Sequence, residues 1–388
     1  MRHTDGGYLC IYLPSVTGHH LTYLDKVIRA LEPTESLLVL TPAVNEEFNR
    51  ITACVGKVIQ YERKFSANSF IQSFHECRVL LKCTQGYAIK KVIAPTGCSA
   101  AFLWPLFNVK ARFDYHFLML SPALINNKSV LENLVKAGLL CMHRKGKLST
   151  IDNASYNSNG LFGRFIRNKF SLIPDPIDTN TPAEKADALK HFGLEKGDFN
   201  VLMCGALNSH PRKNTLTLIK SVIQIPPGEK IRLVLAGRIS PDILDYIATL
   251  PAEQSRKLLV INRFLSDQEL MDITHCCNLV CTPYTHHYSP SGIVLRAIKT
   301  RTPVLVPNYH WFRYMKDNYG IGYSVETLSE DNIAQAIVDI KNRKKPEPLF
   351  GHQQELIDYF SAENFQQHWK AIVYSRSQLM GYADIRLP

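Results

Sequence analysis

The stretch Asn278-Leu279-Val280-Cys281-Thr282-Pro283-Tyr284-Thr285-His286-His287-Tyr288-Ser289-Pro290-Ser291-Gly292-Ile293 decides the fold of this chain. Residues 278–282 predict a buried strand, and an apolar helical pattern follows Gly292 and precedes a second apolar strand at 302–306. Ser291 and Gly292 therefore lie at a helix N-terminus, where free backbone N–H groups and the helix dipole favour a phosphate. Gly292 also lacks a Cβ that would keep a ligand from the backbone. The segment predicts a strand–loop–helix–strand unit with a phosphate-binding turn.

Length and composition indicate a globular protein of two domains. The chain has 388 residues, which favours two domains of about 150–200 residues each. Hydrophobic residues make up 45% of the chain. This fraction is enough to form two cores and argues against disorder. Its apolar runs are shorter than the roughly 20 residues that span a bilayer, and Tyr8–Leu13 is better explained as a first strand than as part of a signal peptide. The ten cysteines lack metal-ligand spacing, so we expect reduced thiols and a cytoplasmic location.

The charge balance indicates anionic partners. Lys and Arg total 45 against 34 Asp and Glu, which gives a net charge of +11. Such a chain attracts nucleotide diphosphates, anionic lipid head groups or nucleic acid. The basic cluster Arg164–Lys169, interleaved with Phe165 and Ile166, is the best candidate for contact with a membrane surface, which would place the protein peripherally on the inner face of a membrane. No nucleic-acid-binding module is recognisable, which disfavours nucleic acid as a partner.

Apolar runs alternate with helical patterns along both halves of the chain, which is typical of βαβ units and parallel sheets. The expected strands of the first half are Tyr8–Leu13, Ser36–Leu40, Lys91–Ala94, Phe117–Leu120 and Leu148–Ile151, and Phe170–Asp178 is expected as a last strand that ends in a rigid double-proline turn. Beyond a polar linker at 179–196, the expected strands are Asn200–Cys204, Arg232–Ala236, Lys257–Ile261, Leu279–Thr282, Val304–Val306 and Gly322–Ser324. The simplest assembly is an α/β protein with two Rossmann-like domains facing across a cleft.

The turns that follow the strands are the places to search for a site, because ligands of open α/β sheets bind at the carboxyl ends of the strands. After the first strand, Gly18 would let the backbone approach a ligand, and His19 or His20 would donate to it or face an acceptor. Each histidine could equally be a helix cap or an exposed side chain. We retain Gly18 and His19 as candidates.

The turn at 204–214 follows the first strand of the second half and contains Gly205, Arg212 and Lys213. Two adjacent cations could neutralise a diphosphate leaving group, although a solvated surface turn is the alternative. Later turns contain Gly237, and then Arg263 and Phe264, which could flank a nucleobase. Each of these later signals is weak alone, and their recurrence in one half adds weight.

The second half resembles the donor domain of retaining GT-B glycosyltransferases, specifically glycosyltransferase family 4, the glycosyl transferases group 1. The matching elements are Pro174-Asp175-Pro176, Gly205 with Arg212-Lys213, Leu233–Gly237, Asn278–Tyr284, Ser291-Gly292-Ile293 and Thr302-Pro303-Val304. The segment 360–369 resembles the C-terminal helix that returns to the first domain in that family, and Gly18-His19-His20 resembles the family's first βα turn. The resemblance implies an acceptor domain at 1–178, a donor domain at 179–358 and a returning helix at 359–388.

The resemblance also implies an activity: transfer of a hexose from a nucleotide-diphosphate sugar to a glycan or lipid-linked acceptor of a cell-surface polysaccharide or lipopolysaccharide. The reaction would retain the anomeric configuration and use no metal or other cofactor, with the nucleotide sugar as donor substrate. Catalytic roles would fall to Arg212, Lys213 and His19. Donor contacts would come from Gly18, Gly205, Gly237, Arg263, Phe264, Tyr288, Ser291, Gly292, Ile293 and Arg296.

Two departures from the family pattern concern charge. The family usually has two glutamates bracketing the Ser-Gly segment, and here Tyr288 or Ser289 takes the first position and Arg296 the second. A carboxylate contact to the ribose is then lost unless another acid, such as Glu326, supplies it. The family's usual arginine after the diphosphate-turn glycine is Ala206 here, and Arg212 could take its role.

Three alternatives remain open. A nucleotide-sugar 2-epimerase would share the architecture, but the turns of the second half offer few acids for its chemistry. A non-catalytic relative that binds nucleotide or glycan as a partner subunit is favoured by the missing glutamates and disfavoured by Arg212, Lys213 and the Ser291-Gly292 turn. Nucleic-acid binding has the least support.

Overall fold

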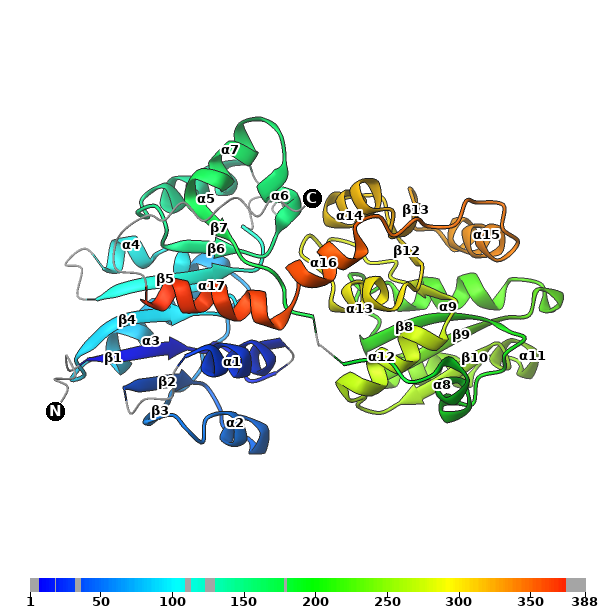
Figure 1. Cartoon of the computed structure of the whole chain (residues 1–388), viewed down its shortest axis with the longest axis horizontal. Coiled ribbons are helices and arrows are strands. Elements are labelled where there is room, and N and C mark those ends of the chain that lie inside the picture. The colour runs from blue at the N-terminus through cyan, green and yellow to red at the C-terminus, as the bar shows by residue number, and fades with distance from the viewer. Residues whose placement is uncertain are drawn as a thin grey trace. The chain divides into compact units, whose positions relative to one another are not determined.

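The computed structural model describes residues 7–17, 19–31, 36–108, 113–122, 130–177 and 180–374. Their contacts divide the chain into two compact units. Among the described residues, the first unit contains those up to Pro176 and those from Ala362 onward, and the second contains Ile177–Ser361. Each unit is built on one parallel sheet covered by helices (Figure 1).

The first unit contains a seven-stranded sheet in the order β3-β2-β1-β4-β5-β6-β7. Its strands are β1 (Tyr8–Tyr12), β2 (Leu37–Thr41), β3 (Lys57–Gln60), β4 (Ile89–Ala94), β5 (Asp114–Met119), β6 (Leu148–Thr150) and β7 (Phe170–Leu172). Its helices are α1 (His19–Ala30), α2 (Glu46–Ile51), α3 (Ser69–Cys83), the short 3-10 helix η1 (Ser99–Ala101), α4 (Trp104–Phe107), α5 (Val130–Cys141), α6 (Asn153–Asn157), α7 (Gly160–Lys169) and α17 (Ala362–Tyr374). The segment from Phe170 was expected as a last strand that ends in a double-proline turn, and β7 does end at Leu172, before the two prolines.

Both faces of the first sheet are buried, because alternate residues of each strand enter different cores. Cys10 and Tyr12 of β1 pack against residues of α3, η1 and α4, whereas Ile11 lies in the core beneath α1. The same second core contains Phe365 and Trp369, both fully buried, which fixes α17 on the face of α1 (Figure 1). Burial on both faces produces the continuous apolar runs that are seen in the sequence.

The end of α17 is also held by polar contact. Lys91 of β4 donates from Nζ to the backbone oxygen of Ile372, 2.6 Å away. The ring of Trp369 meets His116 edge-on, with 5.7 Å between centroids. The helix at the end of the described chain is therefore an integral part of the first unit.

The second unit contains a six-stranded parallel sheet in the order β10-β9-β8-β11-β12-β13. Its strands are β8 (Phe199–Leu207), β9 (Ile231–Ile239), β10 (Leu258–Asn262), β11 (Leu279–Cys281), β12 (Val304–Pro307) and β13 (Gly322–Val325). Its helices are α8 (Lys185–Phe192), α9 (Thr215–Ile223), the short 3-10 helix η2 (Pro227–Glu229), α10 (Pro241–Ala248), α11 (Ala252–Ser255), α12 (Asp267–Cys276), α13 (Gly292–Thr300), α14 (His310–Tyr319), α15 (Glu330–Lys341) and α16 (Gln353–Tyr359). The prediction of two Rossmann-like α/β sheets is confirmed.

Helices cover the second sheet in two groups. α9 packs with α15, while α8 and α13 both pack with α12. The start of α12 is set by a capping box, in which Ser266 Oγ accepts from the Glu269 backbone and the Glu269 carboxylate accepts from the Ser266 backbone. Within the described residues of both units, no helix is long and apolar enough to cross a bilayer.

Candidate functional site

The order of the second sheet marks the point where a ligand is expected. From β8 the chain continues outward through β9 to β10, whereas β11, adjacent to β8 on its other side, continues in the opposite direction through β12 to β13. The loops after β8 (208–214) and after β11 (282–291) therefore leave the same edge at the position where strand order reverses. Open α/β sheets bind their ligands at such a switch point.

The two loops are bonded to each other. The Thr285 backbone N–H donates to the Arg212 carbonyl over 2.9 Å, and the Thr285 hydroxyl donates to the Pro211 carbonyl over 2.8 Å. Lys213 donates from Nζ to the hydroxyl of Tyr284 over 3.1 Å. These bonds bring the Arg212-Lys213 pair against the segment that leads into α13.

Lys213 is a half-buried cation. Its ammonium lies 4.2 Å from the centroid of the Tyr284 ring, and Tyr284 itself is 2% exposed. Burial, and to a lesser degree the charge of Arg212, lowers the pKa of Lys213 to about 8. A bound anion would stabilise the charged form and raise that pKa again. The position is therefore suited to a negatively charged ligand.

Arg212 is exposed, and its side chain forms no ion pair with any other residue that the structure describes. Its backbone N–H donates to Nδ1 of His210 over 3.1 Å. Nearby, burial is the main reason that the pKa of His287 falls to about 4, and the charges of Arg212 and Lys213 lower it further. The loop thus presents two cations beside a neutral imidazole at pH 7.

The loop after β11 ends at the N-terminus of α13. Ser291 is its N-cap residue, is buried, and makes no side-chain capping bond. Gly292 is exposed, and a Cβ built on it would lie 3.4 Å from Nη1 of Arg296, so packing alone does not demand glycine there. Ile293 is buried beneath the turn. The first backbone N–H groups of α13 are thus free of a side-chain cap and open to a ligand.

Arg296 lies one turn further along α13 and is paired within the protein. Its Nη2 contacts Oδ1 of Asp267 at 2.9 Å, and only 17% of its side chain is exposed. The charges of Arg296 and Lys213 both act on the thiol of Cys204, near the end of β8, although burial raises the pKa of that thiol to about 11. Arg296 therefore lies between the switch point and the start of α12.

Gly205 and Gly237 lie inside strands, which corrects the expected strand ends at Cys204 and Ala236. β8 and β9 pair as far as Leu207 and Ile239, with Gly205 opposite Gly237. Their φ angles of 113° and 124° suit glycine. A Cβ on Gly237 would lie 2.1 Å from the carbonyl oxygen of Gly205, whereas one on Gly205 would meet no atom within 4 Å. Packing thus explains Gly237, and open space lies beside Gly205.

Arg263 and Phe264 follow β10, at the outer edge of the sheet and two strands from β8. Arg263 Nη2 is 2.5 Å from Oε1 of Glu269, so its charge is balanced. Phe264 is 71% exposed, and Arg238 of β9 lies 5.6 Å from the centroid of its ring. This ring is available for stacking, but the structure does not join it to the Arg212-Lys213 loop.

Aromatic residues that the sequence analysis did not select support the loop after β11. The Tyr309 hydroxyl donates to the Tyr284 carbonyl over 3.0 Å and accepts from the His287 backbone N–H over 2.9 Å. The predicted site residue Tyr288 packs with Tyr309 and with His310, at centroid distances of 5.7 Å and 5.4 Å. The density of aromatic residues at 284–288 and 309–312 was the available signal for this framework.

The predicted site residues of the first unit lie at the start of α1. Gly18 lies outside the described residues. His19 is exposed, and its ring stacks on His20 with 4.4 Å between centroids. Burial, followed by the charges of His19 and Arg63, lowers the pKa of His20 to about 3. On the next turn Tyr23 donates from its hydroxyl to Asp175 of the Pro-Asp-Pro segment.

No described part of the chain gathers three or more His, Cys, Asp or Glu side chains in a manner that would hold a metal ion. The described site itself contains cations, backbone N–H groups and neutral aromatic side chains.

Solved structures of similar fold place the chain among known architectures. HepE from Anabaena, crystallised in complex with UDP, aligns with a TM-score of 0.67 at 16% identity, over 93% of this chain and 98% of that one. WaaG, a glycosyltransferase involved in lipopolysaccharide biosynthesis, aligns with a TM-score of 0.64 at 12% identity, over 95% and 100%. Sucrose-phosphate synthase from Thermosynechococcus elongatus aligns with a TM-score of 0.64 at 13% identity, over 95% and 98%.

No protein-family model and no curated protein sequence matches this chain. At identities this low, structural likeness defines the fold alone. The protein has the GT-B fold, an α/β architecture with two Rossmann-like domains.

Proposed function

We propose that this protein is a glycosyltransferase that moves a hexose from a nucleotide-diphosphate sugar to a glycan or lipid-linked acceptor. The observation that carries the proposal is the bonded pair of loops at the switch point of the second sheet. There Lys213 and Arg212 lie against the segment that ends at the uncapped N-terminus of α13. One structural neighbour of the same fold, HepE, was crystallised both with UDP and with UDP-glucose.

The leaving group explains why such a site needs cations. When the bond from the anomeric carbon to the diphosphate breaks, negative charge develops on the departing oxygen. Lys213 and Arg212 would neutralise that charge, and the backbone N–H groups of Ser291, Gly292 and Ile293 would bind the phosphate oxygens. These groups would supply electrostatic stabilisation without a metal ion. Gly205, with open space beside it, would let the diphosphate approach β8 closely.

Retention at the anomeric carbon is part of the proposal. A departing diphosphate oxygen that accepts the proton of the attacking hydroxyl on the same face needs no carboxylate nucleophile. The described switch-point residues fit this route, because they hold and orient charge and include no pair of acids. His19, at the start of α1, would contact the acceptor hydroxyl.

The ribose and base contacts differ from the family pattern. Arg296 is engaged by Asp267, and Tyr288 packs among aromatic rings, so neither position provides a carboxylate. Glu326 follows β13, two strands from β11, and accepts a hydrogen bond from Asn308. We therefore propose that the exposed ring of Phe264, with Arg263 beside it, stacks on the base and supplies affinity that a ribose carboxylate would otherwise give.

A lipid-linked acceptor would place the first unit near a membrane. Leu161 at the start of α7 is 84% exposed, and α5 exposes Leu131 and Leu134 by 73% and 65%. Arg167 and Lys169 of α7 donate to backbone carbonyls of neighbouring segments, so their role in the described structure is internal. The exposed leucines, more than the basic cluster, support contact with a membrane surface.

A second function is favoured by one observation. The absence of both expected glutamates from the α13 segment is consistent with a partner subunit that binds a nucleotide without catalysis. Both functions predict nucleotide binding, and only the transferase predicts turnover.

The test is a binding and turnover screen with UDP-, GDP-, ADP- and CMP-sugars. Thermal shift would report binding, since a ligand at one hundred times its Kd adds about 2.7 kcal/mol of stability. Release of the nucleoside diphosphate, with and without a candidate acceptor, would report turnover. Binding without release for every acceptor supports the subunit. No thermal response to any member of the panel would overturn both functions.

A further inference from the structure

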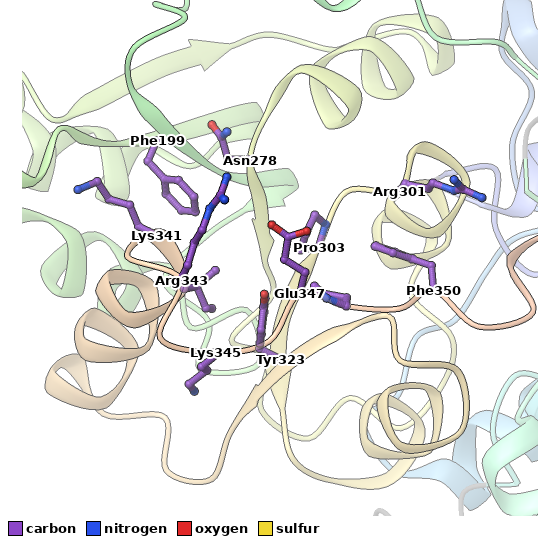
Figure 2. Close-up of a pocket in the computed structure, with 12 residues that line it drawn as sticks. Phe199, Asn278, Arg301, Pro303, Tyr323, Lys341, Arg343, Lys345, Glu347 and Phe350 are labelled. Atoms are coloured by element: carbon purple, nitrogen blue, oxygen red, sulfur yellow. The ribbon is translucent and has the colours of Figure 1, made fainter.

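A cavity of about 480 Å³ lies at the amino ends of the strands of the second sheet (Figure 2). Its wall includes Phe199 at the start of β8, Asn278 before β11, Pro303 before β12 and Tyr323 in β13. In a parallel sheet these positions lie at the edge opposite to the Arg212-Lys213 loop. The volume falls within the roughly 300–1,000 Å³ of small-molecule sites. Because the cavity and the Arg212-Lys213 loop lie at opposite edges of the sheet, the cavity is separate from the proposed donor site.

Two opposite charges enter the cavity without meeting. Figure 2 shows Arg343 extending toward Asn278 and Glu347 extending toward Pro303, both from the segment after α15. In the described part of the chain, neither side chain forms an ion pair or a hydrogen bond with another residue. A ligand with both an acidic group and hydroxyl groups would satisfy the two together.

The other cationic side chains of the wall either bind protein groups or point away from the cavity. Lys341 Nζ lies 2.7 Å from Oε2 of Glu229. Arg301, at the rim, donates to the side chain of Gln353. In Figure 2 the Lys345 side chain points away from the cavity. Arg343 is thus the cation that a ligand inside the cavity would meet.

Backbone strain coincides with this wall. Arg301, Arg343 and Phe350 have φ angles of 54°, 53° and 47°, in the left-handed region. The two arginines lie at the ends of α13 and α15, where glycine is the favoured residue. A non-glycine residue there costs about 1–3 kcal/mol, and such positions cluster at ligand sites. Arg301 binds Gln353, whereas the Arg343 side chain has no ion-pair or hydrogen-bond partner among the described residues.

The rest of the wall is suited to a sugar ring. Phe199, Tyr323 and Phe350 provide apolar ring faces. The side-chain carbonyl of Asn278 accepts from the Asn200 backbone over 2.8 Å, which orients its NH₂ group as a donor. A carboxylate accepts hydrogen bonds from sugar hydroxyls, and a guanidinium matches the geometry of a phosphate.

We propose that this cavity binds a small sugar phosphate, with the phosphate on Arg343, hydroxyl groups on Glu347 and Asn278, and the apolar face of the ring against the aromatic side chains. The site is independent of the proposed transferase activity, because it shares no residue with the loops at the opposite edge of the sheet.

The test is calorimetric titration of the full chain, with and without UDP. The probes are glucose 6-phosphate, mannose 6-phosphate and N-acetylglucosamine 6-phosphate, with glucose and inorganic phosphate as partial ligands. At least one sugar phosphate is expected to bind more tightly than either partial ligand. Arg343→Ala is expected to weaken it at least about tenfold, as for loss of one charge-assisted contact. Glu347→Gln is expected to weaken it less.

Matched variants separate binding from folding. Arg343→Gly removes the same charge but suits the left-handed backbone, so its Tm should equal or exceed that of the wild type while binding is lost. Lys344→Ala is the control, because Lys344 pairs with Asp339 and does not line the cavity. Lys213→Ala should retain sugar-phosphate binding.

The proposal is overturned if no sugar phosphate binds, if binding survives in both Arg343 variants, or if UDP competes with the probe. Inorganic phosphate that binds as tightly as the sugar phosphates would overturn it as well. Failure of the transferase screen, with sugar-phosphate binding intact, would leave this site standing and reject only the proposed function.

Discussion

The first βα turn of each unit follows the first strand of its sheet, yet the two turns differ in charge. After β1, α1 begins with His19 and His20, and His20 is neutral because its pKa is lowered to about 3. After β8, the corresponding turn contains Arg212 and Lys213. The same local topology therefore presents uncharged rings in one unit and two cations in the other.

This difference separates two kinds of ligand chemistry. A neutral imidazole exchanges hydrogen bonds with hydroxyl groups, whereas adjacent cations attract a diphosphate. We therefore propose that the turn of the first unit meets the acceptor and that the turn of the second meets the donor. In this proposal the side chains at the two turns, and not the shared topology, distinguish the two ligands.

The contrast between the neutral turn after β1 and the cationic turn after β8 would lose its functional meaning if transfer did not need Lys213. Lys213→Ala is expected to reduce transfer by about 10²–10³-fold, the range for loss of one group that stabilises developing charge. Steady-state kinetics with the donor identified by the screen would measure it. Lys220→Ala is the matched control, since Lys220 lies on α9 and pairs with Glu330 at the surface. Turnover near the wild-type level in Lys213→Ala would remove this residue from the mechanism.

The pH dependence of donor binding would also test whether the charge of Lys213 binds the diphosphate. The pKa of Lys213 in the free protein is about 8. A bound diphosphate would raise it, because an opposite charge nearby favours the protonated amine. Above that pKa, binding must be accompanied by proton uptake, so the Kd should rise by up to about tenfold per pH unit. Below it, Lys213 is already charged and contributes no slope.

Calorimetry between about pH 7 and about pH 9 would measure this slope, and Lys213→Ala should remove it. An equal slope in the wild type and the variant would show that another group takes up the proton. The result would then count against the half-buried ammonium as the anion-binding charge.

The sequence predicted those parts of the fold that depend on local pattern. β9 and β12 appear as continuous apolar runs because both of their faces are buried. β3 was not predicted, because this edge strand is largely exposed and consists of Lys57, Val58, Ile59 and Gln60. Edge strands lack the burial that produces an apolar run.

The candidate site was inferred from the positions of its residues after strands, and its contacts could not be inferred in this way. The turn containing Arg212 and Lys213 followed from its place after a strand. The bond of Lys213 to Tyr284, and that of Arg296 to Asp267, join residues far apart in sequence and could not be inferred from spacing. The reason for Gly237, contact with the carbonyl of Gly205 on the adjacent strand, likewise required the structure.

A substitution at the start of α1, in the neutral turn after β1, is expected to reduce transfer less than Lys213→Ala does. His19→Ala should lower transfer by about tenfold, the effect of losing one hydrogen bond worth about 1.4 kcal/mol, and leave the donor Kd unchanged. Kinetics over a range of acceptor concentrations, with calorimetry for the donor, would separate the two. His75→Ala, on α3 in the same unit, is a suitable control. A weakened donor Kd in His19→Ala would contradict the assignment of this turn to the acceptor.

The smallest effect is expected at Tyr309, whose hydroxyl holds the loop after β11 without contacting Lys213. Tyr309→Phe keeps the aromatic packing and removes the bonds to the Tyr284 carbonyl and the His287 N–H. Loss of these bonds should lower the free energy of unfolding by about 1 kcal/mol. It should weaken donor binding only severalfold, since Thr285 still joins the two loops. Denaturant unfolding and calorimetry would measure both. A loss as large as that of Lys213→Ala would mean that loop order, and not charge, limits the donor site.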